Sequence, residues 1–358
     1  MKKLLMTTAV CGLAFAATPA NAQVELELGG YFKGYGAYVD QDEAAGTAVN
    51  DFDFIRNTEV HLGGETTLDN GLTVGAHAEF AADGGEFTTD ESYLYFSGNW
   101  GRINVGDEDG AGYLLQVAAP SADSNIDGIR QFVNPVNYGV IGGAGAGLFG
   151  AQFITAANGQ GIDYDMDQSG KSTKLTYLSP ILNGFQIGAS WSPDTTNAAE
   201  NGVGADNSAA EDTYEGALRY EGQFNNVGVI AGAGYVKTVD ETAGGSDRDA
   251  WNVGLDLDVG AFGIGAIYTE DEGNGTTDEE TIVVGVDYTT GPFKLGASYF
   301  DQEDSFTTTT DTVRYSGGVT YTYGPGMTFR GSIGYVEHDV AGTDVDATYV
   351  TLGTQVNF

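Results

Sequence analysis

Residues 349–358 read Tyr-Val-Thr-Leu-Gly-Thr-Gln-Val-Asn-Phe, and apolar and polar side chains nearly alternate along them. In an extended strand, successive side chains point to opposite faces. One face then carries the apolar residues Val350, Leu352, Val356 and Phe358. The other face carries Tyr349, Thr351, Gln355 and Asn357. A strand with one side in lipid and the other in water needs this period of two, so the segment is expected to span a membrane.

The same alternation recurs in about sixteen stretches between Val24 and Phe358. These expected strands cover residues 26–38, 54–66, 72–80, 92–97, 102–106, 171–179, 185–191, 214–223, 227–237, 251–259, 262–269, 281–288, 293–300, 313–323, 327–336 and 344–358. Connections after even-numbered strands are short and often hold Gly or Asn, whereas those after odd-numbered strands are long and acidic. Outer-membrane barrels alternate short periplasmic turns with long external loops in this way. The pattern predicts an all-β fold, a transmembrane antiparallel β-barrel.

The first residues have the features of a secretory signal peptide. Lys2 and Lys3 precede the apolar run Leu4–Ala17, and Ala20-Asn21-Ala22 forms an A-x-A cleavage site. We expect residues 1–22 to be removed, which leaves residues 23–358 as a single barrel domain. Cys11, the one cysteine of the chain, lies in the segment to be removed.

Charge and hydropathy narrow the possible partners. The chain has 51 Asp and Glu against 14 Lys and Arg, a net charge of −37, so no nucleic-acid partner is expected. After residue 22, no window holds the ~18 uninterrupted apolar residues that a membrane helix needs. An exported chain with this strand pattern is expected in the Gram-negative outer membrane, in contact with its lipid and lipopolysaccharide.

Four features carry a resemblance to a known family. They are the start Leu28-Gly-Gly-Tyr-Phe-Lys33-Gly-Tyr-Gly, the run His61-Leu-Gly-Gly-Glu-Thr-Thr-Leu-Asp-Asn-Gly-Leu72, the run Ser92-Tyr-Leu-Tyr-Phe-Ser-Gly-Asn-Trp-Gly-Arg-Ile-Asn-Val-Gly106, and the terminal Phe358. In their order and spacing, the chain resembles the trimeric sixteen-stranded general-diffusion porins of Gram-negative bacteria. The resemblance implies a homotrimer and a water-filled pore. It also implies that the third external loop, here residues 107–170, folds into the barrel and narrows it.

The expected loop is acidic. Its eight acids are Asp107, Glu108, Asp109, Asp123, Asp127, Asp163, Asp165 and Asp167, and its one base is Arg130. The alternation of side chains points seven wall bases inward: Lys33, Arg102, Lys174, Arg219, Lys294, Arg314 and Arg330. An acidic loop inside a pore raises the local concentration of cations, so we expect a weak cation preference.

The expected constriction combines wall bases with the first acids of the loop. Its members are Lys33, Arg102, Lys174, Arg219, Asp107, Glu108, Asp109, Asp123 and Asp127. The best single candidate is Lys33, because it matches the lysine of the first strand in the family motif. Alternatively, these bases only solvate a polar wall and pair with inward acids such as Glu59, Glu79, Asp256 and Asp258.

No cofactor is expected, although the loop leaves room for a structural calcium ion. Asp165, Asp167 and Ser169 copy the first half of a calcium-binding loop, but Thr176 stands where the bidentate acid belongs, which excludes an EF-hand. A looser calcium site at Asp163, Asp165 and Asp167 stays open. His61 and His77 point inward on adjacent strands, but no third ligand stands at a suitable spacing, so a polar wall is expected there.

The function expected from this sequence is passive diffusion of small hydrophilic solutes and ions. A barrel enzyme is not expected, because no Ser-His-Asp arrangement is legible among three histidines. The alternatives are an adhesion barrel and a channel selective for a sugar or another small nutrient. A sugar channel needs aromatic residues along its lumen. Here most tyrosines are at positions expected to face lipid, and Tyr31 and Tyr35 are exceptions that point inward.

Overall fold

The computed structural model describes residues 24–42, 48–83, 87–137, 162–195, 212–240, 245–273, 277–305, 310–340 and 343–358. The predicted signal peptide lies outside these residues, as does part of the third loop, residues 138–161. The signal peptide and its cleavage site therefore stay predictions.

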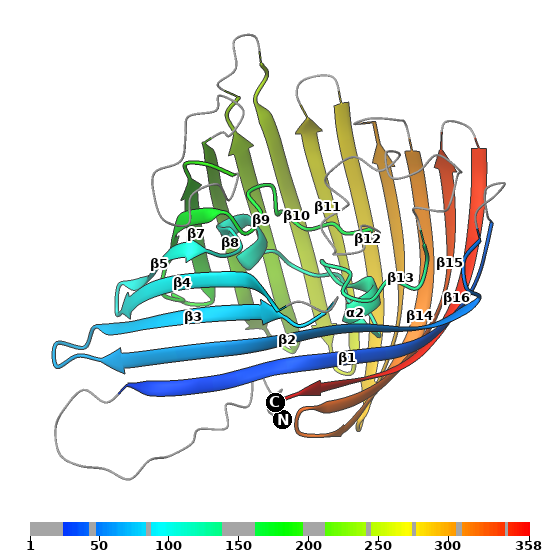
Figure 1. Ribbon diagram of the computed structural model, residues 1–358, viewed down its shortest axis with the longest axis horizontal. Helices are drawn as coiled ribbons and strands as arrows, with labels where there is room; N and C mark the ends of the chain where they lie inside the picture. Colours follow the sequence, from blue (N-terminus) through cyan, green and yellow to red (C-terminus); the bar gives the residue numbers. More distant parts are fainter. Residues whose placement is uncertain are drawn as a thin grey trace.

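The described residues form sixteen antiparallel strands and two short helices. The elements are β1 (Glu25–Gln41), β2 (Phe52–Thr67), β3 (Thr73–Ala81), β4 (Thr88–Gly98), β5 (Gly101–Asp107), α1 (Ala111–Leu114), α2 (Ser124–Asp127), β6 (Thr173–Leu178), β7 (Phe185–Ser192), β8 (Thr213–Phe224), β9 (Val227–Thr238), β10 (Arg248–Val259), β11 (Phe262–Gly273), β12 (Thr277–Thr290), β13 (Phe293–Asp304), β14 (Thr310–Gly324), β15 (Met327–Val340) and β16 (Thr343–Asn357). Each strand pairs with its neighbours in sequence and β16 pairs with β1, so the sheet closes into a barrel (Figure 1). The predicted fold class and strand number are confirmed.

The predicted strand ends differ from the observed ones mainly on the side of the long connections. The strand expected at residues 92–97 begins at Thr88, and the strand expected at residues 54–66 begins at Phe52. These strand ends lack the apolar alternation, as Thr88 and Asp90 show, so the sequence does not identify them as strand. Where a strand extends beyond the bilayer, its outer face needs no apolar side chains.

Strand β10 shows how the alternation becomes two faces. Trp251, Val253 and Leu255 are 36%, 48% and 43% exposed on the outside of the barrel, whereas the intervening Asn252 is 3% exposed. An apolar exterior around a polar interior is the arrangement that a barrel in lipid requires. No helix among the described residues is long and apolar enough to span a membrane.

The two ends of the sheet meet at the last residue of the chain. The backbone N–H of Phe358 donates to the carbonyl of Gly30 at 3.1 Å, beside the pair Tyr31 and Asn357 of the β1–β16 ladder. Gly30 has φ +147°, and a Cβ there would lie 2.3 Å from the carbonyl oxygen of Glu59. A residue without a side chain is therefore needed where β1 bends against β2 and the terminal aromatic ring.

The barrel interior is partly filled by the connection between β5 and β6. A buried apolar cluster joins this connection to the wall. Its members from the connection are Ala119, Ile126, Val133, Val136, Ile162 and Tyr164. Its members from the wall are Tyr35, Val39, Ile267, Val283, Phe300, Val336, Val345, Ala347 and Tyr349. In Figure 1, α2 accordingly lies within the ring of strands. We call residues 108–137 and 162–172 the inner loop.

Candidate pore constriction

The inner loop lies in a track of wall glycines. Each of five consecutive strands, β9 to β13, contributes one of Gly232, Gly254, Gly265, Gly285 and Gly296. A Cβ on the first two would lie 2.8 Å from Val117, and a Cβ on Gly285 would lie 1.8 Å from the carbonyl oxygen of Pro120. Real Cβ atoms do not approach other atoms so closely, so the loop can reach this wall only because the side chains are absent.

Helix α1 begins the attachment on the adjacent strands β7 and β8. The N–H of Ala111 donates to the hydroxyl of Ser190 on β7 at 2.8 Å, and the N–H of Gly112 donates to Glu215 on β8 at 2.9 Å. These N–H groups belong to the first turn of the helix, where no intrahelical acceptor exists. Two wall side chains thus replace the missing backbone partners and fix the start of the loop.

Asp123 is the central attachment point at the other end of the loop. Its carboxylate is fully buried and accepts hydrogen bonds from the Tyr35 hydroxyl at 2.9 Å and from Arg330 Nη1 at 2.7 Å. It also caps α2, because Asn125 N–H donates to it at 3.1 Å. The Asn125 amide in turn donates to Gln355 at 3.0 Å. Through this group the loop is bound to β1, β15 and β16.

Three further inward bases hold the loop. Arg314 Nε lies 3.6 Å from Asp127, with side-chain exposures of 1% and 2%, and Arg314 Nη1 donates to the Ile126 carbonyl at 3.1 Å. Burial raises the pKa of Asp127, while the Arg314 charge opposes that shift. Arg219 donates to the Gln116 carbonyl at 2.9 Å, and Lys174 donates to the carbonyls of Glu108 and Gly170. The wall bases are thus contacts for the loop as well as charges in the lumen.

Arg130 neutralises the acids where the two parts of the loop meet. Its guanidinium lies 2.6 Å from Asp167, 3.0 Å from Asp165 and 3.4 Å from Asp109. Burial raises the pKa of Asp165, and neighbouring Asp109 adds to the shift, although Arg130 opposes it. Asp163 accepts the N–H of Gln131 at 2.5 Å, and burial together with the Asp165 charge raises its pKa to about 8.

A structural calcium ion at Asp163, Asp165 and Asp167 remains a prediction. Arg130 already lies against two of these carboxylates, and a calcium ion would compete with that guanidinium for them.

Lys33 is placed on the inner wall, as the sequence predicts, and is 4% exposed. Its ammonium lies 3.8 Å from the ring centroid of Tyr31 and 3.1 Å from that of Phe132 in the inner loop. Arg102 lies 3.9 Å from the ring centroid of Tyr95 and donates to Asn104 at 2.6 Å. Asn104 in turn donates to Glu108 of the loop at 2.7 Å.

The comparisons with known proteins agree with this geometry. Residues 7–355 match the family model described as Gram-negative porin. The chain belongs to this family. It is therefore an integral outer-membrane protein, and its barrel is an outer-membrane pore. Members of the family are typically channels without enzymatic activity.

Solved structures share the fold of this porin at low identity. An anion-selective porin from Comamonas acidovorans has 17% identity, a TM-score of 0.63, and coverage of 94% of this chain and 100% of that one. The trimer form of the Vibrio cholerae outer-membrane protein OmpT has 16% identity, a TM-score of 0.61, and coverage of 94% and 99%. An uncharacterized protein of Rickettsia felis is 24% identical over 71% of this chain, which spans 61% of the length of that relative.

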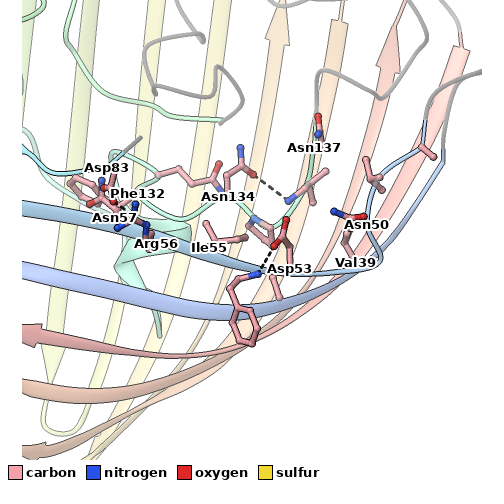
Figure 2. A pocket seen from close by; sticks show the side chains of 17 residues that line it. Val39, Asn50, Asp53, Ile55, Arg56, Asn57, Asp83, Phe132, Asn134 and Asn137 are labelled. Atoms are coloured by element: carbon pink, nitrogen blue, oxygen red, sulfur yellow. Dashed lines mark hydrogen bonds and ion pairs between the residues drawn. The ribbon is translucent and has the colours of Figure 1, made fainter. Parts of the chain in front are cut away.

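A cavity remains open in this porin between the inner loop and the wall. It has a volume of about 760 Å³ and is bounded by loop residues 131–137 and by residues of β1 and β2 and of the connection that joins them. Figure 2 labels Asn134 and Asn137 among the lining residues from the loop, and Val39 and Asn50 among those from β1 and the connection to β2. Asn137 and Gln41 exchange two hydrogen bonds of 2.9 and 3.1 Å at its edge.

Seven of the nine predicted constriction residues belong to the inner loop or contact it directly. They are Lys33, Lys174, Arg219, Glu108, Asp109, Asp123 and Asp127. Arg102 reaches the loop through Asn104, and Asp107 accepts from Thr173 at the end of β5. Whether these residues control permeation stays a prediction. Arg330 lies near the start of β15, close to the tight turn after β14, and Asp123 of the inner loop reaches it there.

Proposed function

We propose that this porin lets small hydrophilic solutes and ions diffuse passively, with a weak preference for cations. The observation that carries the proposal is the acidic inner loop, held against a polar wall by two buried ion pairs and by the hydrogen bond from Arg219. Such a loop narrows the path, and the cavity that the described residues leave beside residues 131–137 supports a path that is not closed. The narrowing limits solute size, and no substrate-specific contact is required.

The excess of acids in the loop supports a preference for cations. Because arginines neutralise part of that negative charge, the proposed preference is weak. Arg130, Arg314 and Arg330 lie against the carboxylates of the loop. Burial also raises the pKa of Asp163 to about 8, so this carboxyl group carries less negative charge at neutral pH. The fold alone does not set the sign of the preference, since the related Comamonas acidovorans porin is anion-selective.

We also infer that the protein is a homotrimer in contact with outer-membrane lipid and lipopolysaccharide, and that it is not an enzyme. The trimer form of the Vibrio cholerae protein, which shares the fold, supports the inferred oligomer. A closed barrel has no free strand edge, so subunits would associate through side chains of the outer face. Light scattering of gently extracted protein should give three chains per particle, and monomers alone would contradict the inference.

Liposome swelling tests the proposed diffusion. Vesicles containing the purified protein are placed in isotonic sugars or amino acids of increasing size. The swelling rate should fall smoothly with solute size and should not saturate with concentration. A rate that saturates for one sugar, or that favours it over a smaller solute, would show a substrate-selective channel instead. The charge preference is measured separately by the zero-current potential.

A further inference from the structure

Two of the three histidines of the chain lie side by side on the inner wall together with acids. His61 on β2 is directly opposite Glu79 on β3, and His77 lies two residues before Glu79. Because β2 and β3 are antiparallel, the segments Glu59-x-His61 and His77-x-Glu79 place four ionisable side chains on one patch of one face. The third ligand that sequence spacing failed to provide is supplied across the strands by Glu79. Glu79 is thus a third candidate ligand that spacing along one strand does not reveal, and the expected polar wall stays a prediction.

The three ligand atoms have the spacing of a metal site. Ligand atoms of His61, His77 and Glu79 lie within 4.8 Å of one another. Glu79 Oε1 is 2.8 Å from His77 Nε2 and 3.6 Å from His61 Nδ1. A tetrahedral ion with bonds of about 2.0 to 2.1 Å separates its ligand atoms by roughly 3.3 Å. The observed distances lie on either side of that value, so small rotations of the side chains can enclose an ion.

A fourth residue orients one of the histidines. Glu59 Oε2 lies 3.2 Å from His61 Nε2, the ring nitrogen that does not face Glu79. With Nε2–H donating to Glu59, Nδ1 is left as the unprotonated nitrogen that a metal requires. Metal-binding histidines commonly donate their second N–H to a carboxylate in this way.

The site is accessible and negatively charged. The side chains of His61, His77 and Glu79 are 27%, 24% and 18% exposed, so an ion can enter from the lumen. Ligand oxygens of Glu59, Glu79 and Asp90 form a second group within 4.8 Å of one another. The nearby base Lys171 forms ion pairs with Asp90, Glu91 and Asp109, and none of these three is a proposed ligand.

We propose that His61, His77 and Glu79 bind one divalent cation of the zinc class on the inner wall of the barrel. Two imidazoles and one carboxylate favour Zn²⁺, Cu²⁺ or Ni²⁺ over Ca²⁺ and Mg²⁺, which prefer oxygen ligands alone. Tyr31 connects the site to the constriction, because its ring packs edge-on against His61 at 5.9 Å and against Phe132 of the inner loop at 6.2 Å. A bound ion adds two positive charges beside the narrow part of the pore. Given the proposed cation preference, it lowers that preference.

Calorimetric titration with Zn²⁺ tests the site on the folded protein after treatment with a chelator. The wild-type protein should bind one ion per chain. His61→Asn and Glu79→Gln should each weaken binding at least about tenfold, as should Glu59→Gln through its contact with His61. The matched control is Glu65→Gln, which removes the same charge from the same face of β2 and changes binding less than twofold. Glu65 accepts a hydrogen bond from Tyr95 at 2.6 Å and is not among the ligand groups.

Two results would overturn the site: Zn²⁺ binding that is the same in wild type and Glu79→Gln, or an equal loss in Glu65→Gln. Heat-dependent migration on gels checks that each barrel is folded, and if Glu79→Gln does not fold, His77→Asn carries the test. Addition of Ca²⁺ at the same concentration should give no comparable heat. The binding measurement does not depend on conduction, so failure of the site and failure of the proposed pore function are distinguished.

Discussion

Asp123→Asn should release the inner loop from the wall. The carboxylate of Asp123 is 0% exposed and accepts from Tyr35, from the N–H of Asn125 and from Arg330, which is 8% exposed. A hydrogen bond to a charged group contributes about 1.5–3 kcal/mol, and loss of that charge leaves the buried guanidinium without its ion-pair partner. Since about 1.4 kcal/mol corresponds to a factor of ten, the population of the released loop should rise roughly 10- to 100-fold.

Hydrogen exchange measures this change directly. The amides of Ile126 and Asp127 donate to the Asp123 carbonyl at 3.1 and 2.9 Å, so they report the attachment of α2. Their exchange should accelerate by the same factor. Single-channel currents should become larger and noisier. Asp287→Asn is the control, because it removes an equal inward charge from a pair between wall residues, with Lys294 at 3.0 Å. Unchanged exchange in Asp123→Asn, or an equal acceleration in the control, would refute the reasoning.

Three other perturbations have defined outcomes. Lys33→Met removes a base beside Phe132 and should strengthen cation preference in the zero-current potential, and an unchanged potential would show that this ammonium does not act on permeating ions. Because burial raises the folded pKa of Asp163 to about 8, its protonated form stabilises the loop, and this stabilisation is lost as pH rises from about 4 to about 8. Loop amide exchange, corrected for its intrinsic rate, should therefore increase over that range, and Asp163→Asn should flatten the increase. Deletion of Phe358 removes the ring packed at Gly30 and should impair membrane insertion while export continues, so normal surface levels in fractionated cells would contradict it.

The strands could be predicted from sequence because their signal is local. The alternation along residues 251–259 alone identifies both faces of β10, and the tight turns fix its neighbours. The prediction of inward bases succeeded for the same reason. Lys33, Arg314 and Arg330 lie on the inner face because parity along a strand does not depend on the rest of the chain.

The attachment of the loop could not be predicted, because it depends on distant pairs. Asp123 and Arg330 are separated by 207 residues, and no local pattern identifies them as partners. The sequence shows the wall glycines only as separate residues. The pairing of β9 to β13 is needed to see that they lie side by side under the inner loop. The proposed metal site has the same origin, since Glu79 reaches His61 only through the pairing of β2 with β3.

The zero-current potential of the purified porin in a dilute potassium chloride gradient tests the central claim most directly, namely that an acidic loop inside the barrel controls the pore. We predict a potential of cation sign that fades with salt, because the Debye length falls from ~30 Å at 0.01 M to ~3 Å at 1 M. A potential of anion sign in dilute salt would contradict the account, because wall bases such as Lys33 and Arg102, rather than the loop acids, would then control the narrowest part of the pore.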